Sequence, residues 1–184
     1  MINIQRIYRK DMPLKGLLTI FETRIDDPKM DRDMKKVIDK QGDRQGHKTN
    51  VKAQMTEWKL HNESGFKKLV NIAIGIAKQV SQSKYNKDVN FKLNDIWGMK
   101  YKSEDTTLAH DHWPATWSFA YYLNAPKDAP GLFFPEMGEQ GGERKLEKGL
   151  FVMFEGHIKH AVRQTKFKGY RYVVSGNLYE VKND

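Results

Sequence analysis

The sequence predicts an α+β fold in which a double-stranded β-helix, a cupin-like jelly roll, is supported by N-terminal helices. Apolar residues recur at helical spacing after Ser64, and from about residue 91 short β-rich runs alternate with turn residues. The length of 184 residues suits one domain with its own core. We therefore expect a single domain over residues 1–184, with 1–90 a largely helical support and polar loop and 91–184 the jelly-roll core.

The N-terminal part contains one polar segment and one clear helix. Residues 26–63 are strongly polar, with a short helix expected from Asp31 to Lys40 and a loop over Gly42–Asn50, where Gly, Asp and Asn cluster. The longer helix follows Ser64, which can cap it. Its apolar positions fall on one face: Phe66, Leu69, Val70, Ala73, Ile76, Ala77 and Val80.

The C-terminal part has the texture of an antiparallel β core. Runs rich in β-branched and aromatic residues are separated by Gly, Pro, Asn and Asp. The expected strands are FKLNDIWGMKY, WSFAYYLN, GLFFPE, GLFVMF and GYRYVVSGNLYEV. Such a series of short strands with close turns predicts a sandwich or jelly roll that packs against the helices.

Composition excludes several classes of site. The chain has no cysteine, which excludes disulfides, thiolate zinc sites and cysteine nucleophiles. The net charge of +9 is spread along the chain, so a nucleic-acid partner is allowed but no motif supports one. The N-terminus lacks the apolar core of a signal peptide, and no apolar run is long enough to span a bilayer. We expect no membrane partner and a cytoplasmic location.

Two histidines stand one residue apart in the stretch HDHWPATWSFAYYLN. On a strand, His110 and His112 share a face and lie about 6.6 Å apart, so both rings can bind one metal ion, while Asp111 points the other way. His157 and His160 follow the turn glycine Gly149 and an apolar strand. A jelly roll brings such strands face to face, so one of these two histidines can complete a facial triad.

Arg171 follows within the last apolar strand, in YRYVVSGN. By strand alternation it shares a face with Val173 and Ser175. An inward-facing arginine requires an anion, because an unpaired buried charge is very costly, and its planar fork suits a carboxylate. We expect a bound dicarboxylate, assisted by Ser175 or by another hydroxyl. The alternative is a salt bridge to a carboxylate of the protein itself.

These motifs, in this order, resemble those of the iron(II)/2-oxoglutarate-dependent oxygenases, closest to the prolyl-hydroxylase-like branch. The resemblance covers residues 91–179. Within that branch, residues 110–122, an HxH pair followed by a Ser-x-x-Tyr-Tyr strand, and residues 154–160 are similar in particular to a sub-branch of uncharacterised bacterial and phage proteins with the order HxH…H…R. The resemblance implies iron(II) and 2-oxoglutarate as cofactors, O2 as cosubstrate, and the cytoplasm of a bacterium or of a phage-infected host cell.

Transferred to this sequence, the resemblance implies roles for individual residues. His110, His112 and His160 would bind iron, and Arg171 would bind the distal carboxylate of 2-oxoglutarate. Tyr122 would hydrogen-bond that carboxylate, and Tyr101 would line the cosubstrate pocket, although core packing is an equal alternative for Tyr101. Three further residues are candidates for the substrate pocket or its entrance: Trp113, Trp117 and His157. The last matches no ligand position of the family.

The chain departs from the common family at His112, where aspartate is usual. Three neutral histidines leave the iron–cosubstrate unit with zero net charge, where the common site has minus one. Asp111 through a bulge, or Asp105 or Glu104, are alternative ligands that rank below His112.

The favoured function is hydroxylation of an unidentified substrate, peptide or protein by preference, with release of succinate and CO2. The main alternative is a non-catalytic, metal-binding jelly roll. A nucleic-acid-binding module with incidental histidines is a third class. The segment 41–62, with His47, Trp58 and His61, could form a lid or substrate loop.

Overall fold

The computed structural model describes residues 6–12, 16–86, 88–138 and 142–181 of the chain. The strands of one sheet are β1 (Arg6–Met12), β2 (Gly16–Arg24), β4 (Gln54–Met55), β5 (Asn90–Tyr101), β7 (Trp117–Tyr122), β8 (Leu150–Glu155) and β10 (Arg171–Val181). The strands of the other are β3 (Val51–Lys52), β6 (Thr106–His110) and β9 (His160–Val162).

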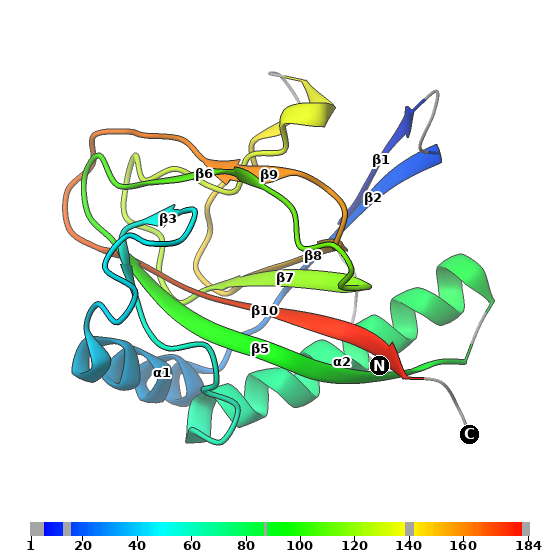
Figure 1. Ribbon diagram of the computed structural model, residues 1–184, viewed down its shortest axis with the longest axis horizontal. Helices are drawn as coiled ribbons and strands as arrows, with labels where there is room; N and C mark the ends of the chain where they lie inside the picture. Colours follow the sequence, from blue (N-terminus) through cyan, green and yellow to red (C-terminus); the bar gives the residue numbers. More distant parts are fainter. Residues whose placement is uncertain (1–5, 13–15, 87, 139–141, 182–184) are drawn as a thin grey trace.

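The two sheets lie one above the other (Figure 1). Within the described ranges, the major sheet has seven strands in the order β1-β2-β8-β7-β10-β5-β4, and the minor sheet has three in the order β3-β6-β9. Every pairing between these strands is antiparallel. This is the double-sheet, antiparallel architecture that the sequence predicted.

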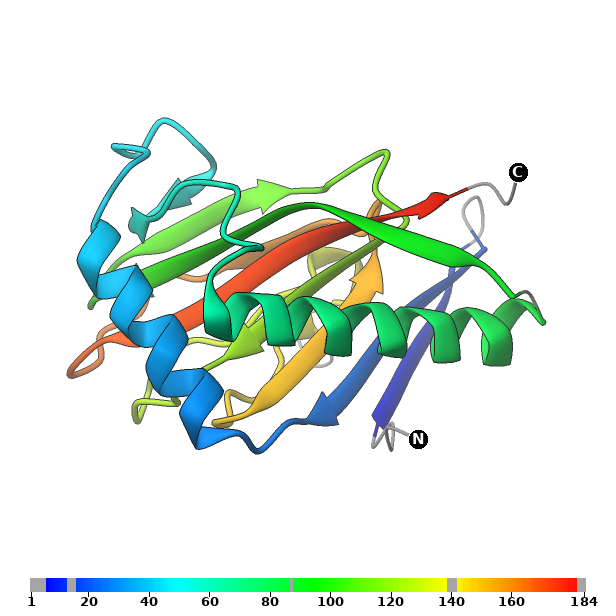
Figure 2. The ribbon, with the colours of Figure 1, turned by 90° about the horizontal axis from the view of Figure 1, so that it is seen from below.

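Two helices cover the outer face of the major sheet (Figure 2). Helix α1 (Pro28–Gln41) begins after Asp27, whose carboxylate accepts a hydrogen bond of 3.0 Å from the Met30 amide. Helix α2 (Ser64–Tyr85) has Glu63 at its N-cap position, without a side-chain capping bond. Ser64 is therefore the first helical residue, and the predicted capping by Ser64 is wrong.

The first 90 residues are less helical than predicted, because β1 and β2 form a hairpin that joins the major sheet along β8. Ile20 and Phe21 of β2 are both buried, one in the core between the sheets and the other under the helices. A strand buried on both faces lacks the alternation of apolar and polar residues that marks a half-exposed strand. The short strands β3 and β4 also lie in this part of the chain.

Four of the five predicted C-terminal runs form strands, namely β5, β7, β8 and β10. The run GLFFPE does not. Phe133 makes isolated bridges to Glu143 and Ala161, and a 3-10 turn, η1 (Pro135–Met137), follows. Proline cannot donate to a strand ladder, so Pro135 ends the pairing there.

Successive residues of β7 pack into different cores. Phe119 and Tyr121 lie against the helices, whereas Ala120 and Tyr122 lie between the sheets. Helix α1 approaches β5 closely at Gly98, where a Cβ would lie 2.3 Å from Cγ1 of Ile38. Among the described residues, no helix is long and apolar enough to cross a membrane.

Candidate metal centre

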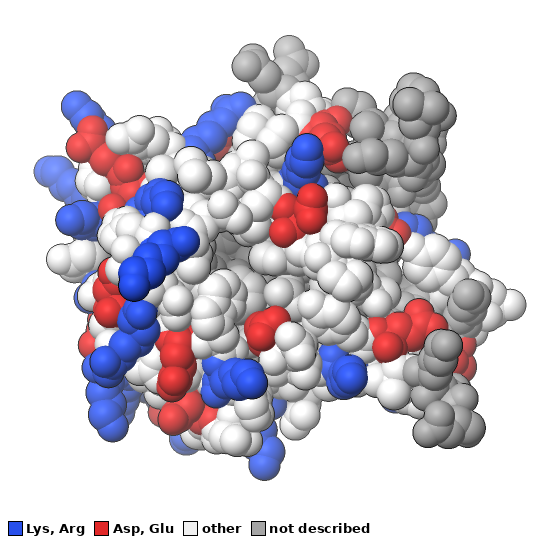
Figure 3. Space-filling model, viewed as in Figure 1, with Lys and Arg blue, Asp and Glu red and all other residues white. Residues whose placement is uncertain are grey.

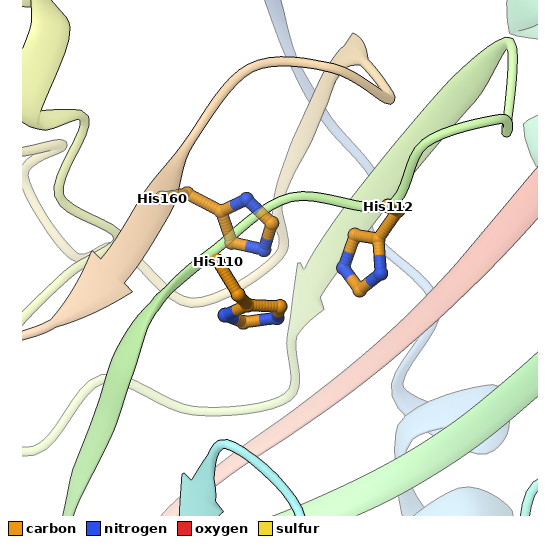
Figure 4. Close-up of side chains that lie close together, drawn as sticks. All are labelled: His110, His112 and His160. Carbon is orange, nitrogen blue, oxygen red and sulfur yellow. The ribbon is translucent and has the colours of Figure 1, made fainter.

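Three histidines converge at one end of the space between the sheets (Figure 4). His110 ends β6 and stands directly opposite His160, the first residue of β9. His112 lies in the loop after β6, where its amide donates a hydrogen bond of 2.7 Å to the Gly156 carbonyl. One ligand atom from each ring lies within 4.8 Å of the others. The structure thus brings together the three histidines predicted to bind a metal.

Backbone hydrogen bonds fix the tautomers of two rings. Nδ1 of His110 lies 2.8 Å from the Leu108 carbonyl oxygen, and Nδ1 of His160 lies 3.1 Å from the Ile158 carbonyl oxygen. A carbonyl oxygen only accepts, so each Nδ1 must carry the proton and each Nε2 must keep its lone pair. This is the usual arrangement of metal-binding histidines, in which a second hydrogen bond orients the ring.

The protein environment keeps all three rings neutral. Burial lowers the pKa of His110, and burial together with the neighbouring His110 lowers the pKa of His112 to about 4. Burial and both other histidines lower the pKa of His160, whose ring packs 4.7 Å from the ring of Phe154. Neutral imidazole is the form that binds metal ions, so the site is ready for a cation near neutral pH.

No carboxylate joins the histidines. Asp111 turns away and accepts a hydrogen bond of 3.1 Å from the Trp113 amide, and Asp105 accepts one of 2.8 Å from the Lys102 amide. In the part of the chain that the structure describes, only the three histidines form a group of three or more side chains able to share one ion. The alternative ligands Asp111, Asp105 and Glu104 are therefore not supported.

The histidines form one wall of a cavity between the two sheets. The floor is formed by β5, β7 and β10 of the major sheet. The predicted cosubstrate residues Tyr101, Tyr122, Arg171 and Ser175 all line this cavity together with the histidines. The apolar lining consists of Val51, Met99, Ala120, Leu132, Val162 and Val173.

Arg171 is buried in this cavity without an acidic partner. Only 1% of the residue is exposed. Its guanidinium carbon lies 4.0 Å from the ring centroid of Tyr101, and one terminal nitrogen donates to the Pro130 carbonyl. Its Nε is buried without a hydrogen-bond partner, and no described acidic residue forms an ion pair with it. The alternative of a structural salt bridge is not supported, and a buried cation of this kind calls for an anionic ligand.

The two predicted tyrosines flank Arg171. The ring centroid of Tyr122 lies 5.7 Å from the guanidinium carbon, and the hydroxyl of Tyr101 lies 2.6 Å from the Thr107 hydroxyl. Burial raises the pKa of Tyr101 and raises that of Tyr122 to about 12. Both phenols stay protonated at neutral pH and can donate to a carboxylate beside Arg171.

Ser175 lies at the other end of the cavity floor. It is four residues from Arg171 along β10, a separation of about 13 Å on a strand. That distance is more than one carboxylate group can bridge, and the guanidinium lies over Tyr101, the residue that pairs with Arg171 itself. Ser175 lines the same cavity as Arg171, and its assistance to Arg171 stays a prediction.

The three candidate pocket residues do not line the cavity. Trp117 is buried on the opposite face of the major sheet, where its Nε1 donates a hydrogen bond of 3.2 Å to the Ser81 hydroxyl of α2. The prediction that Trp117 lines the pocket is wrong for this reason. Trp113 is 76% exposed beside His112, and its role at the entrance stays a prediction. His157 lies in the loop between β8 and β9.

Trp97 is the main residue that the sequence analysis missed. It lines the cavity with Met99 and Tyr101, the alternate residues of β5. Its ring centroid lies 5.9 Å from that of His112. The signal was present in the sequence, because strand alternation places Trp97 on the same face as Tyr101.

Fold and site together define a class: a jelly roll whose two sheets enclose a three-histidine metal site and an unpaired arginine. The fold is that of the 2-oxoglutarate- and iron(II)-dependent oxygenases, prolyl hydroxylases among them, and the histidines fit an HxH…H pattern. No family model matches the sequence, and no curated protein matches it.

Three solved structures illustrate the likeness. The viral collagen prolyl hydroxylase of Paramecium bursaria Chlorella virus-1, in its 2-oxoglutarate complex, is 17% identical over 85% of this chain and 94% of its own, with a TM-score of 0.59. A prolyl-4-hydroxylase of Pseudomonas putida is 12% identical over 89% and 93%, with a TM-score of 0.64. HygX of Streptomyces hygroscopicus, with nickel and 2-oxoglutarate bound, is 10% identical over 87% and 82%, with a TM-score of 0.61. At these identities the comparison establishes the fold.

Proposed function

We propose that this protein is an iron(II)- and 2-oxoglutarate-dependent oxygenase. The observation that carries the proposal is one cavity with two binding elements. At one side stand three neutral histidines, and on the floor lies a buried arginine that pairs with no acidic side chain of the described residues. A dicarboxylate that also binds a metal would use both elements at once.

In this proposal, one group of residues binds the metal and another binds the cosubstrate. Nε2 of His110 and Nε2 of His160 bind iron together with a ring nitrogen of His112, and Arg171 and Tyr122 hold the distal carboxylate of 2-oxoglutarate. When bound, iron and 2-oxoglutarate supply the oxidation, in which O2 converts 2-oxoglutarate to succinate and CO2 and one oxygen atom enters a C–H bond of the substrate. The apolar lining excludes water, which strengthens the pairing of Arg171 with its carboxylate.

For the primary substrate we favour a peptide or protein, since two of the similar structures are named prolyl hydroxylases. A cytoplasmic location belongs to the same proposal. A nucleic-acid partner gains no support from the surface: despite the net charge of +9, acidic side chains are interspersed among the basic ones on the face in Figure 3.

The second candidate is a non-catalytic jelly roll that binds a metal for structure or recognition. One observation favours it: the ligand set is three histidines, without the carboxylate of the common family. Such a set binds zinc or nickel as readily as iron. The two candidates differ in whether 2-oxoglutarate binds at the metal.

Anaerobic titration separates the two candidates. Iron(II) is added first and 2-oxoglutarate second, while the weak visible charge-transfer band of the chelate is followed. We expect the band in the wild-type protein and in His157→Ala, the matched control, and a metal affinity at least about 100-fold lower in His160→Ala. Iron binding without the band would favour the non-catalytic candidate. Failure to bind any divalent metal would overturn both.

A further inference from the structure

We infer that Trp97 is a hydrogen-bond donor to the small ligand that occupies the metal position beside His112, with Ser175 next to it. This inference rests on the proposed metal site. It does not require that 2-oxoglutarate bind there.

Trp97 has a polar group that the protein does not use. The residue is 3% exposed, and its Nε1 is buried without a hydrogen-bond partner among the described residues. Buried donors of this kind are rare, because a buried unpaired N–H loses its hydrogen bond to water and gains none in return. On the outer face of the same sheet, the indole of Trp117 is paired with Ser81. An unpaired indole N–H in a cavity wall therefore indicates an acceptor that arrives with a ligand.

The position of Trp97 indicates which bound group its N–H can reach. Along the cavity floor, Arg171 pairs with Tyr101 and Ser175 pairs with Trp97. Arg171 and Ser175 are separated by about 13 Å along β10, so the two pairs lie at opposite ends. The ring of Trp97 instead neighbours the ring of His112, with centroids 5.9 Å apart. Its partner is thus a ligand at the metal and not the distal carboxylate at Arg171.

The ring of Trp97 packs against a second tryptophan, Trp58. Trp58, in the loop before α2, contacts it edge-on with ring centroids 4.8 Å apart. Trp58 does not line the cavity. This contact restricts the Trp97 ring, and Trp97 also lines the cavity. Trp58 is also one of the residues of the predicted substrate loop, so that loop supports the site from outside.

The charge of the ligand follows from the ligand set. Three neutral imidazoles leave the full charge of a divalent metal uncompensated, whereas the carboxylate of the common family would cancel part of it. A small anion or the oxygen of a polar ligand would supply the missing negative charge. A hydrogen bond from Trp97 stabilises that charge in a site with little water. The ligand class is therefore a small anionic acceptor.

The test uses the cobalt(II)-loaded protein and azide as the probe. The visible bands of cobalt(II) report metal binding and azide binding separately. We expect Trp97→Phe to weaken azide binding at least about fivefold, and Ser175→Ala to weaken it less, while cobalt affinity changes by less than about twofold. The matched control is Trp58→Phe, which keeps an aromatic ring against Trp97 but removes the indole N–H of a residue that does not line the cavity. It should leave azide affinity within about twofold.

A second measurement, by NMR, is made on the wild-type protein. In the zinc(II)-loaded wild-type protein, azide should move the indole N–H resonance of Trp97 downfield and leave that of Trp117 in place. An unmoved Trp97 resonance, or equal azide affinity in Trp97→Phe and Trp58→Phe, would overturn the inference. If azide binding depends on Trp97 but 2-oxoglutarate never binds, the inference stands and the proposed function fails. If 2-oxoglutarate binds but azide binding does not depend on Trp97, the proposed function stands and the inference fails.

Discussion

Buried polar groups on the two faces of the major sheet differ in their hydrogen-bond partners. On the outer face, under the helices, the Trp117 indole donates to Ser81, and the Tyr121 hydroxyl donates to Asp31 over 2.7 Å. These pairs join strands to helices. Each links residues far apart in the sequence, and each buries both partners within the protein.

On the inner face, two polar groups have no hydrogen-bond partner among the described residues. Nε of Arg171 and Nε1 of Trp97 are buried without hydrogen bonds, although both residues are almost completely enclosed. Folding alone would not favour such groups, because they lose water and gain nothing. The difference teaches that the outer face is built for stability and the inner face for a ligand. Three predictions test this contrast.

The largest effect is expected at Arg171. Arg171→Met should weaken 2-oxoglutarate binding to the nickel-loaded protein about 30-fold, since a charge-assisted pair of about 2 kcal/mol is lost. The free energy of unfolding without ligand should stay the same or rise, because an unpaired buried charge is removed. Calorimetry and chemical denaturation measure the two effects. Arg163→Met removes a half-exposed arginine and serves as the control. An unfolded Arg171→Met protein would show that this arginine is structural.

The consecutive residues Tyr121 and Tyr122 give a direct comparison of the faces. Tyr121→Phe should lower the free energy of unfolding by about 1–2 kcal/mol, because the buried Asp31 carboxyl loses its donor, and should leave 2-oxoglutarate affinity unchanged. Tyr122→Phe should do the opposite, with affinity lowered several-fold and stability nearly unchanged. Denaturation and calorimetry on both variants check this. Loss of stability in both, with no loss of affinity, would contradict the contrast.

The smallest effect concerns Asp39 of α1, at the edge of the outer face. Burial opposes its ionisation, but hydrogen bonds from Lys100, Lys35 and Tyr172 outweigh this and lower the pKa of Asp39 to about 2. Its contribution to stability is therefore fully present above its ordinary pKa of 3.8 and is lost as the pH falls through about 2.

We expect wild-type protein to exceed Asp39→Asn in unfolding free energy by about 0.5–1 kcal/mol at pH 6, a small value because solvent screens this partly exposed group. The two proteins should converge near pH 2. Denaturation at several pH values measures the difference, and a gap that persists at pH 2 would assign the effect to packing.

Much of the site could be predicted from sequence because its signals are local. His110, His160 and Arg171 each stand at the end of a strand, where alternation gives the direction of the side chain. His112 follows His110 by two residues in the adjoining loop. The register between strands was not available from one sequence. It is the register that pairs Ser175 with Trp97 and so separates Ser175 from Arg171.

Two errors have different physical origins. The hairpin of β1 and β2 was missed because residues such as Ile20 and Phe21 are buried on both sides and show no strand alternation. The orientation of Trp117 could have been found. Since Tyr122 faces the cavity, a residue at an odd distance along the same strand must face the helices.

The cavity lies between the two sheets, and its binding elements are divided between them. All three histidines come from the minor sheet and the loops beside it, whereas Arg171 belongs to the major sheet. A dicarboxylate held by a metal at one end and by Arg171 at the other would therefore act as a removable cross-link across the sandwich. The protein with and without this ligand would then have the same chain path. The two forms would differ chiefly in stiffness, because the bound ligand would resist separation of the two sheets.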